Sequence, residues 1–72
     1  AALFVQTSAK FEADILVCNT TRETGYNNAK SIIDVMMLGV EQDHRITIQA
    51  EGEDAEAALT ALVELVQLGV NS

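Results

Sequence analysis

The C-terminal part of the chain holds the pattern that most restricts its fold, a strand followed at once by an amphipathic helix. Residues 45–50 alternate between polar and apolar types, which is the period of a strand with one buried face. The turn 51–53 leads to Asp54, which predicts the N-cap of a helix ending near Gly69. The apolar residues of that helix share one stripe: Ala55, Ala58, Leu59, Leu62, Leu65 and Val66. A strand and a helix that each bury one face favour a layered structure.

The N-terminal segment 1–10 is typical of a short helix, because Ala2, Val5 and Ala9 fall on one face with Phe4 beside them. No Ser, Thr, Asp or Asn precedes this segment to serve as an N-cap. The pattern therefore resembles the remainder of a longer element.

The middle of the chain predicts the remaining elements. Residues 13–18 are apolar and β-branched, which predicts a strand buried on both faces or nearly so. The polar residues 19–28 predict a loop with a short strand near 24–26. Ser31 and Gly39 stand at the start and the stop of a short helix. The expected fold is an α+β open-faced sandwich, in which an antiparallel sheet is covered on one face by three helices.

The length and composition bound the class of protein. The 72 residues contain no proline, repeat or low-complexity linker, so we expect a single domain over residues 1–72. A formal net charge of −7 argues against binding to nucleic acid, whose phosphates need clustered Lys and Arg. Apolar runs such as 35–38 are far too short for membrane insertion.

Few side chains carry chemistry by themselves. Cys18 lies in an apolar strand with no adjoining cation, so we expect an inert buried thiol, and a lone cysteine fits the cytoplasm. His44 could serve as a proton shuttle or phosphate acceptor, but its local sequence favours an exposed residue at the start of a strand. The acidic residues 51–56 lack the ligand alternation of a calcium loop, so no metal or cofactor is expected.

Ser31 allows two interpretations. As an N-cap, its oxygen satisfies free amides in the first turn of the next helix, and the local sequence favours this role. Alternatively, the hydroxyl is phosphorylated, which Lys30 would favour and Asp34 would oppose.

The helix after Ser31 carries more apolar surface than one buried stripe requires. We expect Val35 and Leu38 to pack in the core. Ile32, Ile33 and Met36 would then form an exposed, adaptable patch of the kind found at partner interfaces.

The run 30–39, Lys-Ser-Ile-Ile-Asp-Val-Met-Met-Leu-Gly, resembles the regulatory-serine signature of HPr, the histidine-containing phosphocarrier family of the bacterial sugar phosphotransferase system. Residues 1–7 resemble the first helix of that family, 46–54 its last strand and turn, and 55–66 its final helix. The resemblance covers nearly the whole chain and implies the HPr-like open-faced sandwich.

The chain departs from the family pattern in two places. The loop 19–28 is a few residues longer than the usual hairpin. The family's phosphorylated histidine belongs to a His-x-Arg-Pro motif directly before the first helix, a position that precedes Ala1, and His44 does not match it. We therefore expect that the catalytic histidine and first strand are missing, that the domain is incomplete at its N-terminus, and that the 45–50 edge is open to self-association.

The resemblance implies a phosphocarrier rather than a true enzyme. It would relay phosphate from the phosphoenolpyruvate-charged enzyme of the phosphotransferase system to sugar-specific transporter subunits. Ser31 would be the target of a dedicated Ser kinase that directs the protein to a transcriptional regulator of carbon use. The positions that match the partner-docking patch are Ala2, Ile32, Ile33, Met36 and Gly39. The alternatives are a catalytically silent HPr-like regulatory or interaction module, and an unrelated α+β binding domain.

Overall fold

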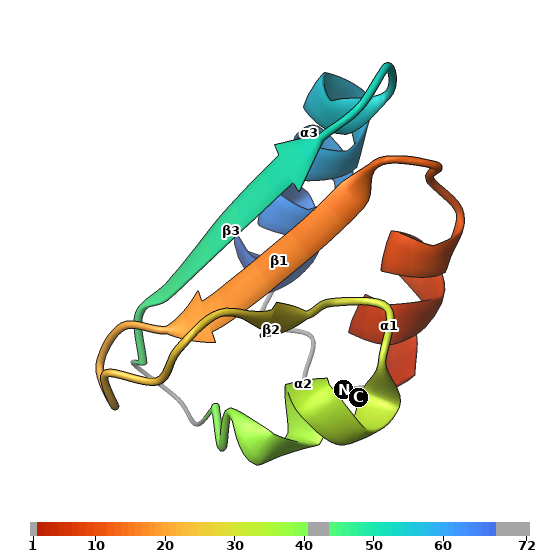
Figure 1. Cartoon of the computed structure of the whole chain (residues 1–72). Helices are drawn as coiled ribbons and strands as arrows, with labels where there is room; N and C mark the ends of the chain where they lie inside the picture. Colours follow the sequence, from red (N-terminus) through yellow and green to blue (C-terminus); the bar gives the residue numbers. More distant parts are fainter. Residues whose placement is uncertain (1, 41–43, 68–72) are drawn as a thin grey trace.

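The computed structural model describes residues 2–40 and 44–67, and its elements follow the predicted order. The elements are α1 (Ala2–Ala9), β1 (Asp14–Asn19), β2 (Asn27–Asn28), α2 (Ile32–Met37), β3 (Ile46–Glu51) and α3 (Ala55–Gln67) (Figure 1). The end predicted for the last helix, near Gly69, lies outside the described residues. None of the helices in these two ranges is long and apolar enough to cross a membrane.

The strands form one antiparallel sheet in the order β2-β1-β3. β3 pairs with β1 along its whole length, so that Val17 lies opposite Ile48. β2 pairs with the other edge of β1 through two residues only, with Asn28 opposite Leu16. The short strand therefore lies beyond the 24–26 predicted, where the polar loop has come back alongside β1. Within the described part of the chain, the outer edge of β3 has no partner strand.

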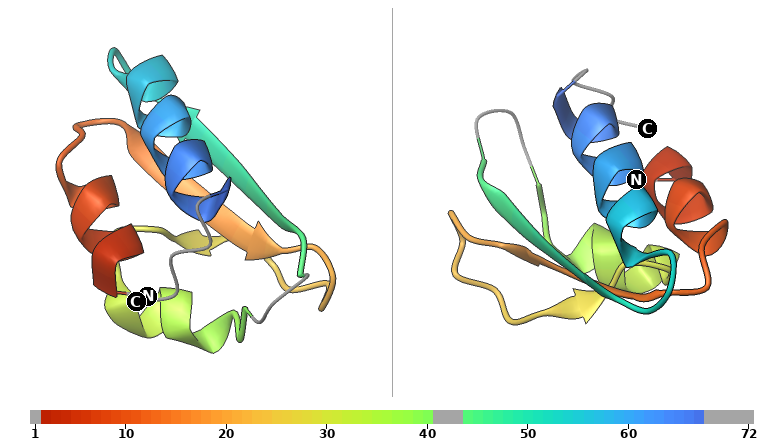
Figure 2. Two further views of the ribbon diagram at one scale, coloured as in Figure 1. Left: turned by 180° about the vertical axis from the view of Figure 1, so that it is seen from behind. Right: turned by 90° about the horizontal axis from the view of Figure 1, so that it is seen from above.

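All three helices lie on one face of the sheet, as the two views in Figure 2 show. α1 packs beside α3 across that face, and α2 contacts both β2 and α1. The opposite face of the sheet carries no helix of the described residues. The predicted open-faced α+β sandwich is confirmed.

The core lies between β1 and α3 and reaches the end of α2. β1 supplies Ile15 and Val17, α3 supplies Leu62, and Leu38 enters from the residue after α2; all four side chains are buried. Burying an aliphatic side chain of this size stabilises a fold by about 1.5–3 kcal/mol. Leu38 therefore fastens the end of α2 to the same core that joins helix to sheet.

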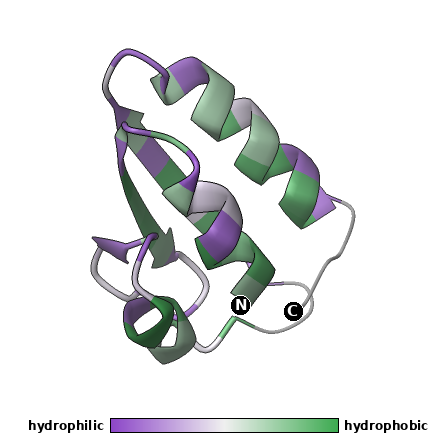
Figure 3. Ribbon diagram, turned by 90° about the vertical axis from the view of Figure 1, so that its right-hand side faces the viewer, coloured by the Kyte–Doolittle hydropathy of each residue, from purple (hydrophilic) through white to green (hydrophobic). Residues whose placement is uncertain are grey.

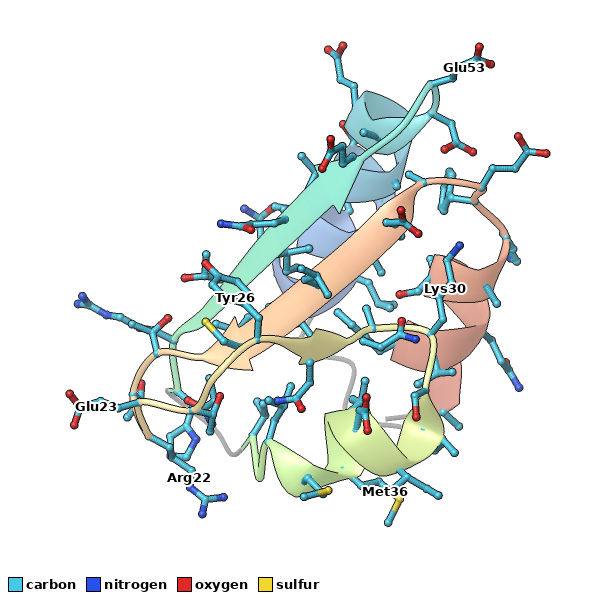
Figure 4. The ribbon with its side chains drawn as sticks, viewed as in Figure 1. Arg22, Glu23, Tyr26, Lys30, Met36 and Glu53 are labelled. Atoms are coloured by element: carbon cyan, nitrogen blue, oxygen red, sulfur yellow. The ribbon has the colours of Figure 1, made fainter. Side chains whose placement is uncertain are left out.

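The outer face of β1 is open, which corrects the expectation of a strand buried on both faces. Leu16 is 41% exposed there. Cys18 is buried on this face, close to Tyr26, whose side chain lies across the sheet (Figure 4). Gln49 Nε2 donates to the Tyr26 hydroxyl at 3.1 Å. Desolvation and then the neighbouring Cys18 thiol raise the pKa of Tyr26.

The buried side of α1 differs from the predicted face. Ser8 is fully buried and Phe4 packs against the core, whereas Ala2 and Ala9 are exposed. The Ser8 hydroxyl donates to the carbonyl of Phe4 at 2.9 Å, so its burial leaves no unsatisfied polar group. The apolar pattern missed Ser8 because a serine bonded within its own helix is as easily buried as an alanine.

Candidate functional site

Helix α2 begins after Ser31, which caps it. Ser31 has extended backbone angles, φ −104° and ψ 118°, and its hydroxyl oxygen accepts from the amide of Asp34. This distance is 3.4 Å, at the long end of the hydrogen-bond range, so the cap is weak. The carboxylate of Asp34 accepts from the amide of Asn28 at 3.4 Å. The N-cap role of Ser31 is confirmed, and its phosphorylation stays a prediction.

The ammonium of Lys30, next to Ser31, is engaged with another segment. Lys30 Nζ donates to the carbonyl of Phe11 at 2.6 Å, in the connection between α1 and β1 (Figure 4). Its own amide donates to Asn28 Oδ1 at 3.0 Å. One of the three donors of the Lys30 ammonium is therefore already used by the Phe11 carbonyl.

The exposed side of α2 is apolar. None of the residues of this helix is buried, and Figure 3 shows it mostly hydrophobic at the foot of the molecule. We call the exposed apolar set of this region the α2 patch, which comprises Ile32, Ile33, Met36, Met37 and Val40. Ile33 is 68% exposed, Met36 65% and Met37 70%. The predicted exposure of Ile32, Ile33 and Met36 is confirmed, and their role in docking stays a prediction.

Two members of the α2 patch, Met37 and Val40, were not identified from the sequence. The periodicity around Leu38 contained the signal. With Leu38 buried, the residues three and four positions before it, Val35 and Asp34, share its side of the helix. Met37, one position before Leu38 and about 100° from it around the helix, lies outside that shared side and is the most exposed member of the patch.

The other two predicted docking residues, Ala2 and Gly39, lie outside α2. Ala2 is exposed at the start of α1, and Figure 1 places that end of the chain beside α2. Gly39 follows the helix with φ +59°, a left-handed conformation that favours glycine. The guanidinium of Arg22 occupies the space that a side chain on Gly39 would need. The structure thus brings Ala2, α2 and Gly39 to one end of the molecule.

Polar groups gather at the C-terminal end of α2. The carbonyl of Leu38, the C-cap residue, accepts from Asn19 Nδ2 at 3.0 Å and from Arg22 Nη1 at 3.2 Å. Asn19 Nδ2 also lies 3.0 Å from Nδ1 of His44. The exposed position expected for His44 is wrong, because its half-buried ring bonds a residue 25 positions away in sequence.

Comparison with known proteins decides the family. The model of the PTS HPr component phosphorylation site matches residues 1–67. The chain belongs to the HPr family of the phosphotransferase system. Since this match covers nearly the whole chain, the resemblance found in the sequence is confirmed.

Curated relatives of this HPr-family chain are much longer proteins. It is 42% identical over 69 residues to a multiphosphoryl transfer protein of Vibrio cholerae, covering 96% of the chain and 17% of that protein. A multiphosphoryl transfer protein of Haemophilus influenzae is 39% identical over 70 residues, with coverage of 97% and 14%. The chain therefore spans less than a fifth of the length of these relatives.

Solved HPr structures share the fold. An HPr dimer from Thermoanaerobacter tengcongensis superposes with a TM-score of 0.87 at 42% identity, covering 99% of this HPr-family chain and 78% of the other. Crh of Bacillus subtilis, a catabolite repression protein described as an intertwined dimer with domain swapping, gives a TM-score of 0.82 at 37% identity, with coverage of 99% and 78%.

Proposed function

We propose that this chain is part of an HPr-type phosphocarrier, a protein that relays phosphate from the phosphoenolpyruvate-charged enzyme of the phosphotransferase system to sugar-specific transporter subunits. The family match over residues 1–67 carries this proposal. The multiphosphoryl transfer proteins of Vibrio cholerae and Haemophilus influenzae support it, because their name describes the same chemistry. A carrier of this kind works in the cytoplasm and needs no metal or cofactor of its own.

The α2 patch is the proposed docking surface, together with Ala2 and Gly39. Large apolar side chains on a short helix are exposed to water here, which is the property expected of an interface. Two of the five are methionines, whose flexible side chains adapt to partners of different shape. One surface could thus serve both the phosphate-donating enzyme and the sugar-specific subunits in turn.

Ser31 is the proposed regulatory phosphorylation site for a Ser kinase. Its hydroxyl contributes only the 3.4 Å bond to the amide of Asp34, so modification would cost α2 little. A phosphate there would add about two negative charges beside the α2 patch and near the Asp34 carboxylate. We expect such a change to select among partners, a transcriptional regulator included, because it alters charge at an interface while leaving the fold in place.

We also propose self-association through the β3 edge. Along this edge, in the part of the chain that the structure describes, the backbone groups face no other strand. A hollow of about 340 Å³ adjoins the start of β3 and is largely apolar, with Phe4, Leu38, Val40, Ile46 and Val66 among its lining residues. The relatives described as dimers make a second copy of the chain the natural occupant to test.

Binding to the phosphoenolpyruvate-dependent enzyme of Vibrio cholerae tests the phosphocarrier proposal without requiring transfer of phosphate. In an NMR titration of the labelled chain, we expect the largest shifts at the methyl groups of Met36, Met37 and Ile33. The NMR signals of residues on the outer sheet face, such as Leu16, should shift little. If no shift occurs at near-millimolar enzyme, the docking role is excluded and the proposed function fails.

A further inference from the structure

The position of α2 depends on what holds its ends. The helix has six residues and none of them is fully buried; Val35 packs partly against the core, and buried Leu38 follows the last residue, so few core contacts hold the helix itself. Its N-terminal end has the long hydrogen bond to Ser31 Oγ. At the other end, the carbonyl of Leu38 would be without a partner inside the helix, and it receives two side-chain donors instead.

Asn19 is the buried centre of this arrangement. Its Nδ2 donates to Leu38 O at 3.0 Å, and its Oδ1 accepts from the amide of Arg22 at 3.2 Å. These two bonds fix which end of the side-chain amide is nitrogen. Nδ2 must therefore also donate to His44 Nδ1, 3.0 Å away, so that this ring nitrogen is the acceptor. The bonding pattern thus assigns the Nδ1 lone pair to Asn19, which corresponds to the tautomer that carries its hydrogen on Nε2.

Arg22 supplies the second donor. Its Nη1 donates to Leu38 O at 3.2 Å, which places a cation at the negative end of α2. The same guanidinium lies against Gly39, where the absence of a side chain makes room for it. Asn19 and Arg22 lie at the start of the segment 19–28, so their side chains connect this segment to the end of the docking helix.

We propose that Asn19, Arg22 and His44 are positioning residues that hold the C-terminal end of α2, and with it the α2 patch, in the orientation that partners recognise. This inference rests on the proposed docking function. Asn19 and Arg22 bind the Leu38 carbonyl directly, and His44 holds the Asn19 amide in place. Leu38 anchors the end of α2 in the core, and its carbonyl bonds set the direction of the last turn. When the carbonyl is released, that turn frays and the exposed side chains of Met36 and Met37 lose their fixed direction.

The test uses Arg22→Ala, since Arg22 is exposed and its removal leaves the core intact. Arg45→Ala is the matched control, because it removes the same charge from an exposed side chain near β3 that is not bonded to α2. Arg22→Lys keeps a donor that can reach the carbonyl. Amide hydrogen exchange at Leu38 and Gly39 and affinity for the phosphoenolpyruvate-dependent enzyme of Vibrio cholerae are measured for each variant.

We expect Arg22→Ala to speed exchange at Leu38 and Gly39 and to weaken enzyme binding, each by about three- to tenfold, the effect of one charge-assisted hydrogen bond in a partly exposed setting. Arg45→Ala should change neither the exchange rates nor the affinity for the enzyme. Arg22→Lys should give exchange rates and an affinity between those of Arg22→Ala and the wild type. A nitrogen-15 spectrum of the wild-type His44 ring should show Nδ1 unprotonated, and in Asn19→Ala that preference should disappear.

Three outcomes would overturn the inference. Weaker binding with unchanged exchange would make Arg22 a direct contact instead of a positioning residue. Faster exchange with unchanged binding would mean that the bonds to the Leu38 carbonyl have a purely structural role, while the proposed docking function would stand. If the wild-type chain does not bind the enzyme at all, the proposed function and the inference both fail.

Discussion

The carboxylate of Asp54 accepts a hydrogen bond from the amide of Ala13 at 2.8 Å, across 41 positions of sequence. Its other oxygen accepts from the amide of Glu12, also at 2.8 Å. Asp54 directly precedes α3 and Ala13 directly precedes β1, so one side chain joins the start of the last helix to the start of the central strand. The bond to the Glu12 amide is the main reason that the pKa of Asp54 is lowered, and desolvation opposes it.

This arrangement predicts that the free energy of unfolding decreases at acidic pH, as the Asp54 carboxylate becomes protonated. A carboxyl group whose pKa is lowered by folding stabilises the folded state fully above its unfolded value, here 3.8, and loses that contribution as the pH falls through the lower folded value. Asp54→Asn should therefore melt lower than wild type at pH 7 and show a smaller loss between pH 5 and about pH 2. Thermal unfolding across that range measures the difference. Glu53→Gln, at an exposed neighbour, is the control and should follow the wild type.

The same junction explains why residue 52 is glycine. Gly52 has φ +143°, and a Cβ there would lie 2.9 Å from the Cα of Ala13. Gly52→Ala should therefore cost about 1–3 kcal/mol in the free energy of unfolding, since strain and a backbone clash act together. Gly25→Ala is the matched control, because nothing lies within 4 Å of its added methyl group. It should be neutral or stabilise by up to about 1 kcal/mol. Equal destabilisation by both substitutions would contradict this account.

The sequence predicted those elements whose signals are local. The alternation in β3 and the apolar stripe of α3 are periodic, and the N-cap of α2 is a single residue at its expected place. The errors arose where partners distant in sequence decide the outcome. β1 is open on one face because no helix covers its outer side, and β2 lies where the loop meets β1 again. The periodicity within one segment predicts neither the uncovered face of β1 nor the position of β2.

The candidate site shows the same division. Ile33 and Met36 were identified from the apolar excess on a short helix, and the family resemblance marked Ser31. The contact between Asn19 and His44 was missed, because it joins residues 25 positions apart whose local sequences suggest a strand end and an exposed turn. Nothing in the sequence around Arg22 shows that it lies against Gly39. Such contacts follow from the fold and become visible only once it is known.

The contact between Arg22 and Gly39 predicts a measurable coupling. Gly39→Ala should destabilise for two reasons: the left-handed φ of +59° costs a non-glycine residue roughly 1 kcal/mol, and the new methyl group displaces the Arg22 guanidinium. In an Arg22→Ala background only the first cost remains. A double-mutant cycle by chemical denaturation should therefore give a coupling of about 0.5–1.5 kcal/mol. Additive effects of the two substitutions would show that the guanidinium does not hold this position.

The α2 patch predicts that binding and stability can be separated at Met37. Its side chain is 70% exposed, so Met37→Ser should change the free energy of unfolding by no more than about 0.5 kcal/mol. If Met37 is buried by a partner, the same substitution should weaken binding to the phosphoenolpyruvate-dependent enzyme about tenfold, as expected for a large apolar side chain near the centre of an interface.

Val63→Ser is the matched control for Met37→Ser, because Val63 is also a partly exposed apolar residue but belongs to α3 and not to the α2 patch. Isothermal titration of both variants against the enzyme, with denaturation curves for each, separates the two effects. We expect Val63→Ser to bind like wild type even where it costs some stability. Similar losses of affinity in both variants would mean that the enzyme senses overall stability and not this surface. A loss confined to Met37→Ser would extend the docking surface by one helical position beyond the residues that the family pattern marks.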